Sequence, residues 1–316
     1  MRIILIGLAV AAVASGVSAI IPPYTGFLTA QLAVIVIAVA SLNLLGNVAG
    51  MLSLASAAFM GLGGYGVLIF LTIYGLPLIV SIPLTLIIGF VFGWIMGLIA
   101  VRLSGISLAI VTFGFVQVFQ VFVKQGGAFS GDGYGLILPP VEILGIGPLT
   151  PRIISLTCVF TAAMVLVFTL ALTRSRIGRA WFAIKENPIA AEMQGVNLLS
   201  MRAKAFATSG AMASLAGILQ AFLLGITNPS LYTVDASISH LSMMVVGGSS
   251  GSVAGSVLGP VVLYFLPEFF HLGSYREILY GGALLLTLAL APQGLAGASK
   301  YLGRYLVSTS RNWMRR

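Results

Sequence analysis

The side chains that could act chemically in this sequence are few and mostly uncharged, and they interrupt long apolar runs. Only 7% of the residues are charged, whereas 59% are hydrophobic. The apolar runs contain amides, hydroxyls and one imidazole, at Asn43, Asn47, Ser53, Ser56, Gln117 and His240. Such groups can form brief hydrogen bonds with a small polar solute, and they can equally bond one helix to another. Both interpretations stay open here: a translocation path, or links between helices.

No arrangement typical of catalysis accompanies these residues. His240 and His271 have no acid or nucleophile as a partner within an apolar run, so we expect the chain not to be an enzyme. Cys158 is the one cysteine, which excludes an intrachain disulfide and a cysteine metal cluster. Gly61–Gly66 fits GxGxxG, but no strand precedes it and no acidic residue follows about 20 positions later. The chain lacks GxxxxGK[ST], so we expect it to bind no nucleotide cofactor itself.

The acidic residues offer no convincing ion-coupling site. Ion-driven carriers usually bury ionisable groups along the path. Here Asp235, Glu268 and Glu277 lie near the ends of apolar runs, and His240 lies near the start of one. We therefore expect the energy for any transport to come from outside this chain. An ion-coupled secondary transporter and a non-transporting membrane scaffold or sensor remain the alternatives.

The elements that must position these residues are the apolar runs. With a mean hydropathy of +1.10, the chain is too apolar for one soluble core, and strand-like alternation is absent. We expect an all-α, polytopic integral membrane helical bundle of about ten transmembrane or re-entrant segments, in a single domain over residues 1–316. The segments are Ile3–Ile21, Phe27–Gly46, Leu52–Ile73, Leu76–Val101, Ile106–Val123, Ile153–Leu172, Ala203–Ile226, Ile238–Gly248, Val253–Leu266 and Ile278–Ala291.

The first and the eighth of these segments each have a feature that is not typical of a transmembrane helix. The first resembles a signal peptide, but its length favours an uncleaved helix. The eighth is too short to cross a bilayer core of about 30 Å as one helix.

Glycines spaced by four, at 89, 93 and 97 and at 251, 255 and 259, predict close helix packing. Residues 47–66 and 237–259 are both rich in glycine and serine, which fits either interrupted helices along a path or ordinary close packing.

Lysine and arginine set the expected orientation. Arg2, Arg102, the 174–204 loop and the basic tail from Lys300 all fall on one side if both termini are cytoplasmic. The net charge of +9 and the pI of about 10.0 then indicate contact with anionic membrane lipid and not with nucleic acid.

The 174–204 loop predicts two short amphipathic helices on the cytoplasmic surface. Ser175 can cap the first, in which Ile177, Trp181 and Ile184 share one side. Three bases of this stretch are expected to reach toward headgroups or a partner: Arg176, Arg179 and Lys185.

The second helix has its own start and stop signals. Asn187 is a favourable N-cap, Pro188 suits the first turn, and Gly195 is a favourable stop. Ile189 and Met193, four positions apart, would share a face. The loop could serve only to fix topology, or it could offer a helix for an external motor to grip.

Motifs along the chain resemble a known family. Ala190-Ala191 followed by Gly195 resembles the EAA-xxx-G loop of bacterial ABC importer permeases, with Ile189 in place of the glutamate. The stretch SRIGRAWFAIKENPIAAEMQGVN is similar to the cytoplasmic loop of the branched-chain amino acid permease family, M-type (LivM-like). Further segments resemble that family in order: SLNLLGNVAGMLSLASAAFMGLGGYG, LAIVTFGFVQVFQ, NPSLYTVDASISHLSMMVVGGSSGSVAGSVLGP and PQGLAG.

The resemblance implies an ABC importer of a bacterial inner membrane. Its partners would be a second homologous permease subunit, two ATP-binding subunits that hold ATP and Mg²⁺, and a periplasmic substrate-binding protein. The residues implied in ATPase coupling are Asn187, Pro188, Ile189, Ala190, Ala191, Glu192 and Gly195. Ser56 replaces a histidine that is usual in the family, and Gln117 and Gln120 replace an acid and a base. The cargo therefore stays open among branched-chain or related amino acids, urea or amides, and small carboxylates.

Overall fold

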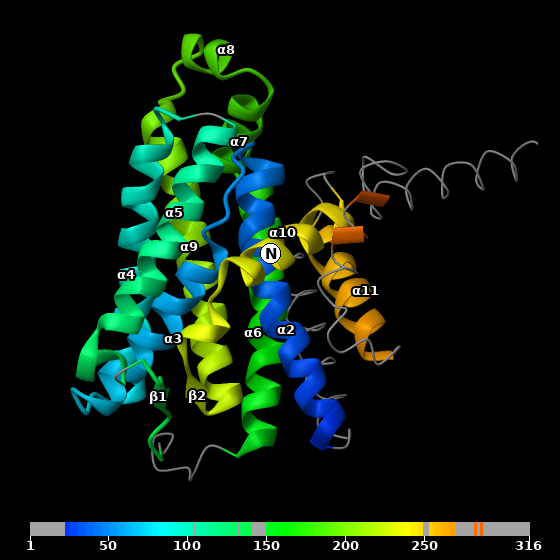
Figure 1. Ribbon diagram of the computed structural model, residues 1–316. Coiled ribbons are helices and arrows are strands. Elements are labelled where there is room, and N and C mark those ends of the chain that lie inside the picture. The colour runs from blue at the N-terminus through cyan, green and yellow to red at the C-terminus, as the bar shows by residue number, and fades with distance from the viewer. Residues whose placement is uncertain are drawn as a thin grey trace, which may run out of the picture.

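The computed structural model describes residues 23–103, 105–131, 133–140, 150–248, 253–269, 281–282 and 285–286. The expected segment Ile3–Ile21, most of Ile278–Ala291 and the basic tail lie outside the described residues. Within them the chain is a helical bundle, drawn in Figure 1.

Five of the described helices are long and apolar enough to cross a membrane. They are α2 (Pro23–Asn43, continued by the π-helix η1, Leu44–Val48), α4 (Leu78–Ala100), α5 (Ile106–Gln125), α6 (Pro151–Arg174) and α9 (Leu198–Leu224). Shorter helices are α3 (Ser56–Thr72), α7 (Arg176–Glu186), α8 (Pro188–Met193), α10 (Val234–Gly247) and α11 (Gly255–Phe269), with the 3₁₀ turns η2 (Gly127–Ser130) and η3 (Pro229–Leu231). The sequence did not predict the two-residue strands β1 (Leu136–Ile137) and β2 (Ile226–Thr227), which pair antiparallel.

Helix α9 lies at the centre of the bundle, where it packs against α4, α3 and α2. The expected glycine stripe of α4 forms one of these contacts. A Cβ at Gly93 would meet the backbone of Phe206 and Ala207, and a Cβ at Gly97 would meet that of Ala203. In lipid, helix association depends on such close backbone approach. The expectation that this stripe serves packing is confirmed.

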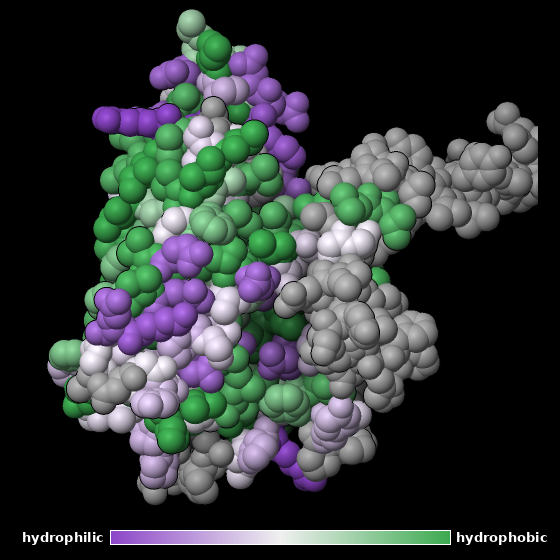
Figure 2. Space-filling model, in the orientation of Figure 1, coloured by the Kyte–Doolittle hydropathy of each residue, from purple (hydrophilic) through white to green (hydrophobic). Residues whose placement is uncertain are grey.

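The outer face of α4 is apolar along its length. Its large side chains point away from the bundle and are exposed, including Ile79, Ile87, Phe92 and Ile95. Figure 2 shows the upper part of this side as mostly hydrophobic, with hydrophilic residues lower on the same side and over the α7–α8 end. The pattern is that of a helix facing lipid acyl chains.

The chain leaves helical geometry between α2 and α3. The π-turn pairs Ala49 N with Leu44 O at 3.0 Å, Gly50 turns the chain with a φ of +71°, and residues 51–55 are not helical. The expected segment Leu52–Ile73 therefore becomes helical only from Ser56. Non-helical backbone at membrane depth is tolerated where it is buried in protein. Side chains from other helices supply its bonds, as described below.

Helices α10 and α11 form an antiparallel hairpin. Gly247 lies against Gly255, and Met243 lies against Gly259, so contacts progress in opposite directions along the two helices. Two glycines of the expected 251–259 stripe thus serve packing, while Gly251 lies outside the described residues. Figure 1 shows α10 crossing the middle of the bundle. With 14 residues, it is too short to span a bilayer core of about 30 Å, as expected.

The two ends of the bundle differ in character. Figure 1 shows α7 and α8 at one end and the β1–β2 pair at the other. The Arg202 guanidinium donates to the carbonyls of Ala100 and Val101 at 3.3 and 3.1 Å. The Arg102 connection and the 174–204 loop therefore lie at the same end of the bundle. This agrees with the expectation that the connections rich in lysine and arginine share one side of the membrane. Which side of the membrane that end faces stays a prediction.

Candidate functional site

Five of the expected path residues are buried around the break between α2 and α3. The Asn47 Nδ2 group donates to Asn43 Oδ1 at 2.6 Å and lies 3.2 Å from the carbonyl oxygen of Gly248. Asn43 Nδ2 in turn donates to Ser256 Oγ at 2.7 Å. These bonds tie the end of α2 to the α10–α11 hairpin.

Ser53, Ser56 and His240 lie in the same region. Ser56 Oγ lies 3.3 Å from His240 Nδ1, which joins the start of α3 to α10. The hydroxyl of Ser53 accepts from the Ala55 amide at 3.2 Å and so supports the non-helical stretch locally. With Asn43 and Asn47, all of these side chains are at most 9% exposed. In this chain alone, they are bonded to protein.

Two hydroxyls complete the network around the non-helical backbone. Thr112 Oγ1 of α5 accepts from the Leu54 amide at 2.9 Å. Ser237 Oγ of α10 accepts from the Ala57 amide at 3.1 Å. Ser237 and the network partner Ser256 were not singled out from the sequence. A usable signal existed for Ser237, because three positions separate it from His240 and both therefore lie on one face of a helix.

Gln117 lies apart from this network. Its side chain is exposed near the middle of α5, among exposed Phe113, Val118 and Val121. Its neighbour Gln120 turns inward and donates to the Tyr232 carbonyl at 3.1 Å. An amide at membrane depth is costly against lipid, since its polar atoms find no partner there. The outer face of α5 thus carries a polar amide, whereas the large exposed side chains of α4 are apolar.

The 174–204 loop folds as the two expected helices. The Ser175 hydroxyl accepts from the Gly178 amide at 3.3 Å and caps α7, and Asn187 Oδ1 accepts from the Ala190 amide at 3.1 Å and caps α8. Gly195 ends this unit with a φ of +82°, a region that favours glycine. The predicted starts and stop are confirmed.

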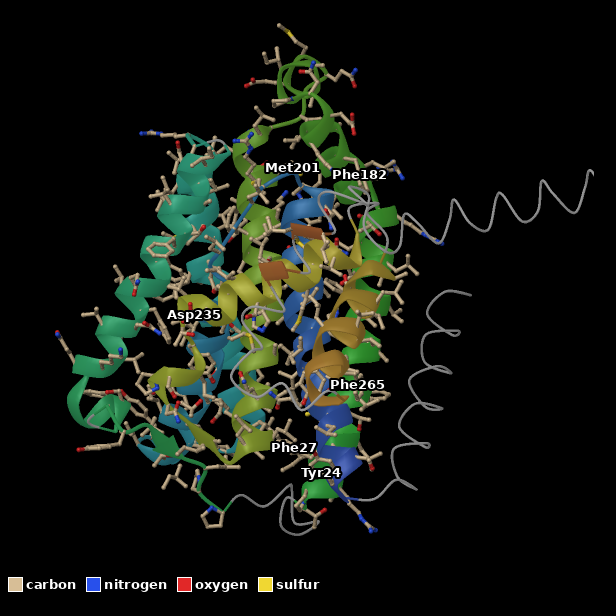
Figure 3. The ribbon with its side chains drawn as sticks, turned by 45° about the vertical axis from the view of Figure 1, so that its right-hand side comes forward. Tyr24, Phe27, Phe182, Met201, Asp235 and Phe265 are labelled. Atoms are coloured by element: carbon tan, nitrogen blue, oxygen red, sulfur yellow. The ribbon has the colours of Figure 1, made fainter. Side chains whose placement is uncertain are left out.

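Helix α7 is fixed to the bundle by its apolar side. Trp181 is buried, and its indole Nε1 donates to the Met201 carbonyl at 2.8 Å. Ile184 is also buried, whereas Ile177 remains partly exposed. Figure 3 places Phe182 of α7 and Met201 of α9 close together at this end. The indole hydrogen bond thus ties α7 to the first turns of α9.

Helix α8 projects beyond the rest of the chain (Figure 1). Ile189 is 69% exposed and Met193 is 85% exposed, and Ala190 and Glu192 are exposed beside them. Ala191 differs, because it is buried at 3% exposure. Of the residues expected to contact an ATPase subunit, this chain itself already covers Ala191.

The expectation for Lys185 is right in part, since the residue is exposed but its ammonium group bonds to protein. It was expected to reach outward with Arg176 and Arg179, but its Nζ donates to the backbone carbonyl of Asn47 at 2.9 Å. The lysine therefore connects the last turn of α7 to the break after α2. Arg176 and Arg179 are exposed.

Comparison with known proteins gives a consistent result. Residues 24–288 match the family described as the permease component of the branched-chain amino acid transport system. The chain is 28% identical to the high-affinity branched-chain amino acid transport system permease protein LivM of Salmonella typhimurium, over 80% of this chain and 65% of LivM. The chain thus spans less than two thirds of that relative's length.

Other similar proteins have related names. The permease protein BraD of Pseudomonas aeruginosa is 26% identical, with 79% of this chain and 87% of BraD covered. The ribose import permease protein RbsC of Haemophilus influenzae is 27% identical, with 68% and 69% covered. No solved structure matches the chain significantly.

Proposed function

The chain belongs to the permease family of branched-chain amino acid transport systems, and we propose that it is a membrane-spanning subunit of a bacterial ABC importer. It would form half of a translocation pathway with a second, homologous permease subunit. Two ATP-binding subunits would supply the energy, and a periplasmic binding protein would deliver the solute. This chain would hydrolyse no ATP itself.

The observation that carries this proposal is the α7–α8 unit. Helix α7 is fixed to α9 through Trp181, while α8 projects with Ile189 and Met193 exposed. Exposed apolar side chains on a short, capped helix outside the membrane suit insertion into a groove of another protein. Because α7 is anchored, a push on α8 reaches the bundle instead of bending a loose loop.

The exposed face of α5 supports a path shared with a second permease subunit. Gln117 is an amide near the middle of an otherwise apolar exposed face. A polar side chain at this depth is expected to face protein or water and not lipid. We therefore place Gln117 where the two permease subunits meet around the solute, with the buried asparagines and serines supporting the neighbouring break.

We propose branched-chain or related amino acids as the cargo. The names of LivM and BraD refer to branched-chain amino acids, and that of RbsC refers to ribose. A neutral path through this subunit would leave selection largely to the binding protein, so urea, amides and small carboxylates stay as alternatives.

The test is transport by the purified complex in lipid vesicles. Radiolabelled leucine, isoleucine and valine are offered with the binding protein, and the vesicles contain either ATP or an imposed proton or sodium gradient. We expect the chain to co-purify with ATPase subunits and uptake to require ATP. Uptake driven by an ion gradient without ATP would instead establish a secondary transporter. Failure of any ATPase to co-purify would favour the scaffold alternative.

A further inference from the structure

One hydrogen bond connects the two halves of the candidate site. Lys185 stands one residue before the end of α7 and two residues before Asn187, the N-cap of α8. Its Nζ donates to the Asn47 carbonyl at 2.9 Å, across 138 positions of sequence. Helix α7, which leads directly into the projecting α8, is thus bonded to the break after α2.

The π-turn explains why this carbonyl points at α7. In η1 the Ala49 amide bonds to Leu44 O, and the Met51 amide bonds to Leu45 O at 2.9 Å. The chain then turns away at Gly50, so the last carbonyls of the helix lack the usual amides from a next turn. A cationic side chain beside such carbonyls is a favourable C-terminal partner.

Gly50 fits the same contact from the other side. A Cβ at this position would lie 2.8 Å from Lys185 Cγ and 3.2 Å from Lys185 Cα. Its φ of +71° also favours glycine. Both the turn and the close approach to α7 therefore depend on a residue without a side chain.

Asn47 carries the connection further through its side chain. While its carbonyl accepts from Lys185, its Nδ2 group bonds Asn43 and the Gly248 carbonyl, and Asn43 bonds Ser256. Gly248 and Ser256 belong to the connection and the second helix of the α10–α11 hairpin. One residue thus joins α7, the end of α2 and the hairpin.

We propose that Lys185 is the positioning residue that transmits displacement of the α7–α8 unit to the break after α2 and to the α10–α11 hairpin. The proposal rests on the proposed function, because an ATPase subunit must first move α8. When α8 moves, Lys185 shifts the Asn47 peptide, and the Asn47 side chain moves the hairpin with it. Trp181 carries a separate contact to α9, so loss of Lys185 uncouples the hairpin without detaching α7.

The test places a reporter on the hairpin of the intact complex. Leu258 is partly exposed on α11 and takes no part in the network, so Leu258→Cys is labelled with an environment-sensitive fluorophore in a Cys158→Ala background. The complex with its ATPase subunits is held in lipid nanodiscs, and the probe is ATP with Mg²⁺ and orthovanadate. ATP hydrolysis is measured on each preparation without orthovanadate, and fluorescence is then recorded on the same preparation after orthovanadate is added.

Three variants distinguish the effect of losing the Lys185–Asn47 hydrogen bond from the effect of losing one positive charge. Lys185→Met keeps an unbranched apolar stem of similar length but removes the donor. Lys185→Arg keeps a donor that can reach the carbonyl. Arg176→Met removes a cation from the exposed face of the same helix and controls for net charge. We expect Lys185→Met to reduce the fluorescence response about fivefold or more with hydrolysis nearly unchanged, while Lys185→Arg and Arg176→Met respond like the parent.

Each other outcome is decisive. A parent complex that hydrolyses ATP without any response at Leu258 would overturn the proposal, as would a normal response in Lys185→Met. An equal loss in Arg176→Met would assign the effect to surface charge and also overturn it. A chain that captures no ATPase and shows no hydrolysis would refute the proposed function itself, which is a separate result.

Discussion

The hydroxyl oxygen of Ser56 lies 3.3 Å from Nδ1 of His240, although 184 positions separate the two residues. Ser56 is the first residue of α3, and His240 lies in the middle part of α10. Both side chains are buried, at 2% and 9% exposure. The pair therefore holds the end of the non-helical stretch against α10, and in this chain Ser56 has a protein partner.

Ser56→Ala should weaken this attachment modestly. Interhelical hydrogen bonds in membrane proteins contribute about 0.6 kcal/mol, so we expect a loss of that order in the free energy of unfolding. Thermal unfolding in detergent measures the change. Thr157→Ala is the matched control, since the exposed Thr157 hydroxyl bonds only Ile153 of its own helix. Equal stabilities for the two variants would contradict a role for Ser56 in joining the helices.

A large residue at position 56 should reduce assembly of the complex, and not simply block solute uptake through an assembled one. Ser56 is buried, so the ring of Ser56→Trp must displace α10 or the start of α3. We expect little assembled complex in the membrane, measured by size-exclusion chromatography after solubilisation. A well-assembled variant that hydrolyses ATP but takes up no solute would show that Ser56 lines an open path.

The sequence predicted the helix ends that depend only on residues a few positions apart. Ser175, Asn187 and Gly195 mark helix ends through bonds and backbone angles within a few residues, and the structure confirms them. The exact position of the helix break could not be predicted from neighbouring residues in this way. The glycine-rich stretch from Gly61 to Gly66 is helical and serves packing, whereas the break precedes it.

Distant partners explain the remaining differences. The non-helical backbone near Leu54 is stable because Thr112 and Ser237 supply hydrogen bonds from other helices. Lys185 looked like one more surface base because nothing near it in sequence indicates the carbonyl that it binds. Pairings over more than a hundred positions require the fold, and the roles of the buried network and of Gln117 in transport stay predictions.

Cysteines at the two ends of the bundle should label from opposite sides of the membrane. Tyr134 is 86% exposed near the β1–β2 end, and Met193 is 85% exposed on α8. In a Cys158→Ala background, a membrane-impermeant maleimide should label Tyr134→Cys from the periplasmic side and Met193→Cys from the cytoplasmic side. Right-side-out and inverted vesicles provide the comparison. Labelling of both from one side would refute the expected orientation of the loops.

Exposed and buried positions of α8 should respond differently to charge. Ile189→Asp alters an exposed side chain, so we expect normal folding, with ATP hydrolysis no longer coupled to uptake. Ala191→Arg forces a long cation into a buried site and should instead reduce the amount of folded protein. Uptake, hydrolysis and the amount of assembled complex are measured for both. Normal uptake by Ile189→Asp would remove the coupling role of this face.

Adding one methyl group should have opposite effects at two helical glycines. At Gly93 of α4, a Cβ would lie 2.5 Å from the Phe206 carbonyl oxygen and 2.9 Å from the Ala207 Cα. Both are backbone atoms that cannot rotate away, so the central α4–α9 contact must open, at a cost of about 1–3 kcal/mol. At Gly114 of α5, no heavy atom lies within 4 Å of the added Cβ. There alanine only improves helix propensity, by up to about 1 kcal/mol.

We therefore expect Gly93→Ala to lower the midpoint of thermal unfolding and Gly114→Ala to leave it unchanged or raise it. Measuring both in the same detergent removes differences due to solvation of the micelle-covered surface. If the two variants shift the midpoint alike, the α4–α9 packing is looser than the structure indicates. If Gly114→Ala destabilises only the assembled complex, the added methyl group meets another subunit. The face of α5 that carries Gln117 would then be an interface.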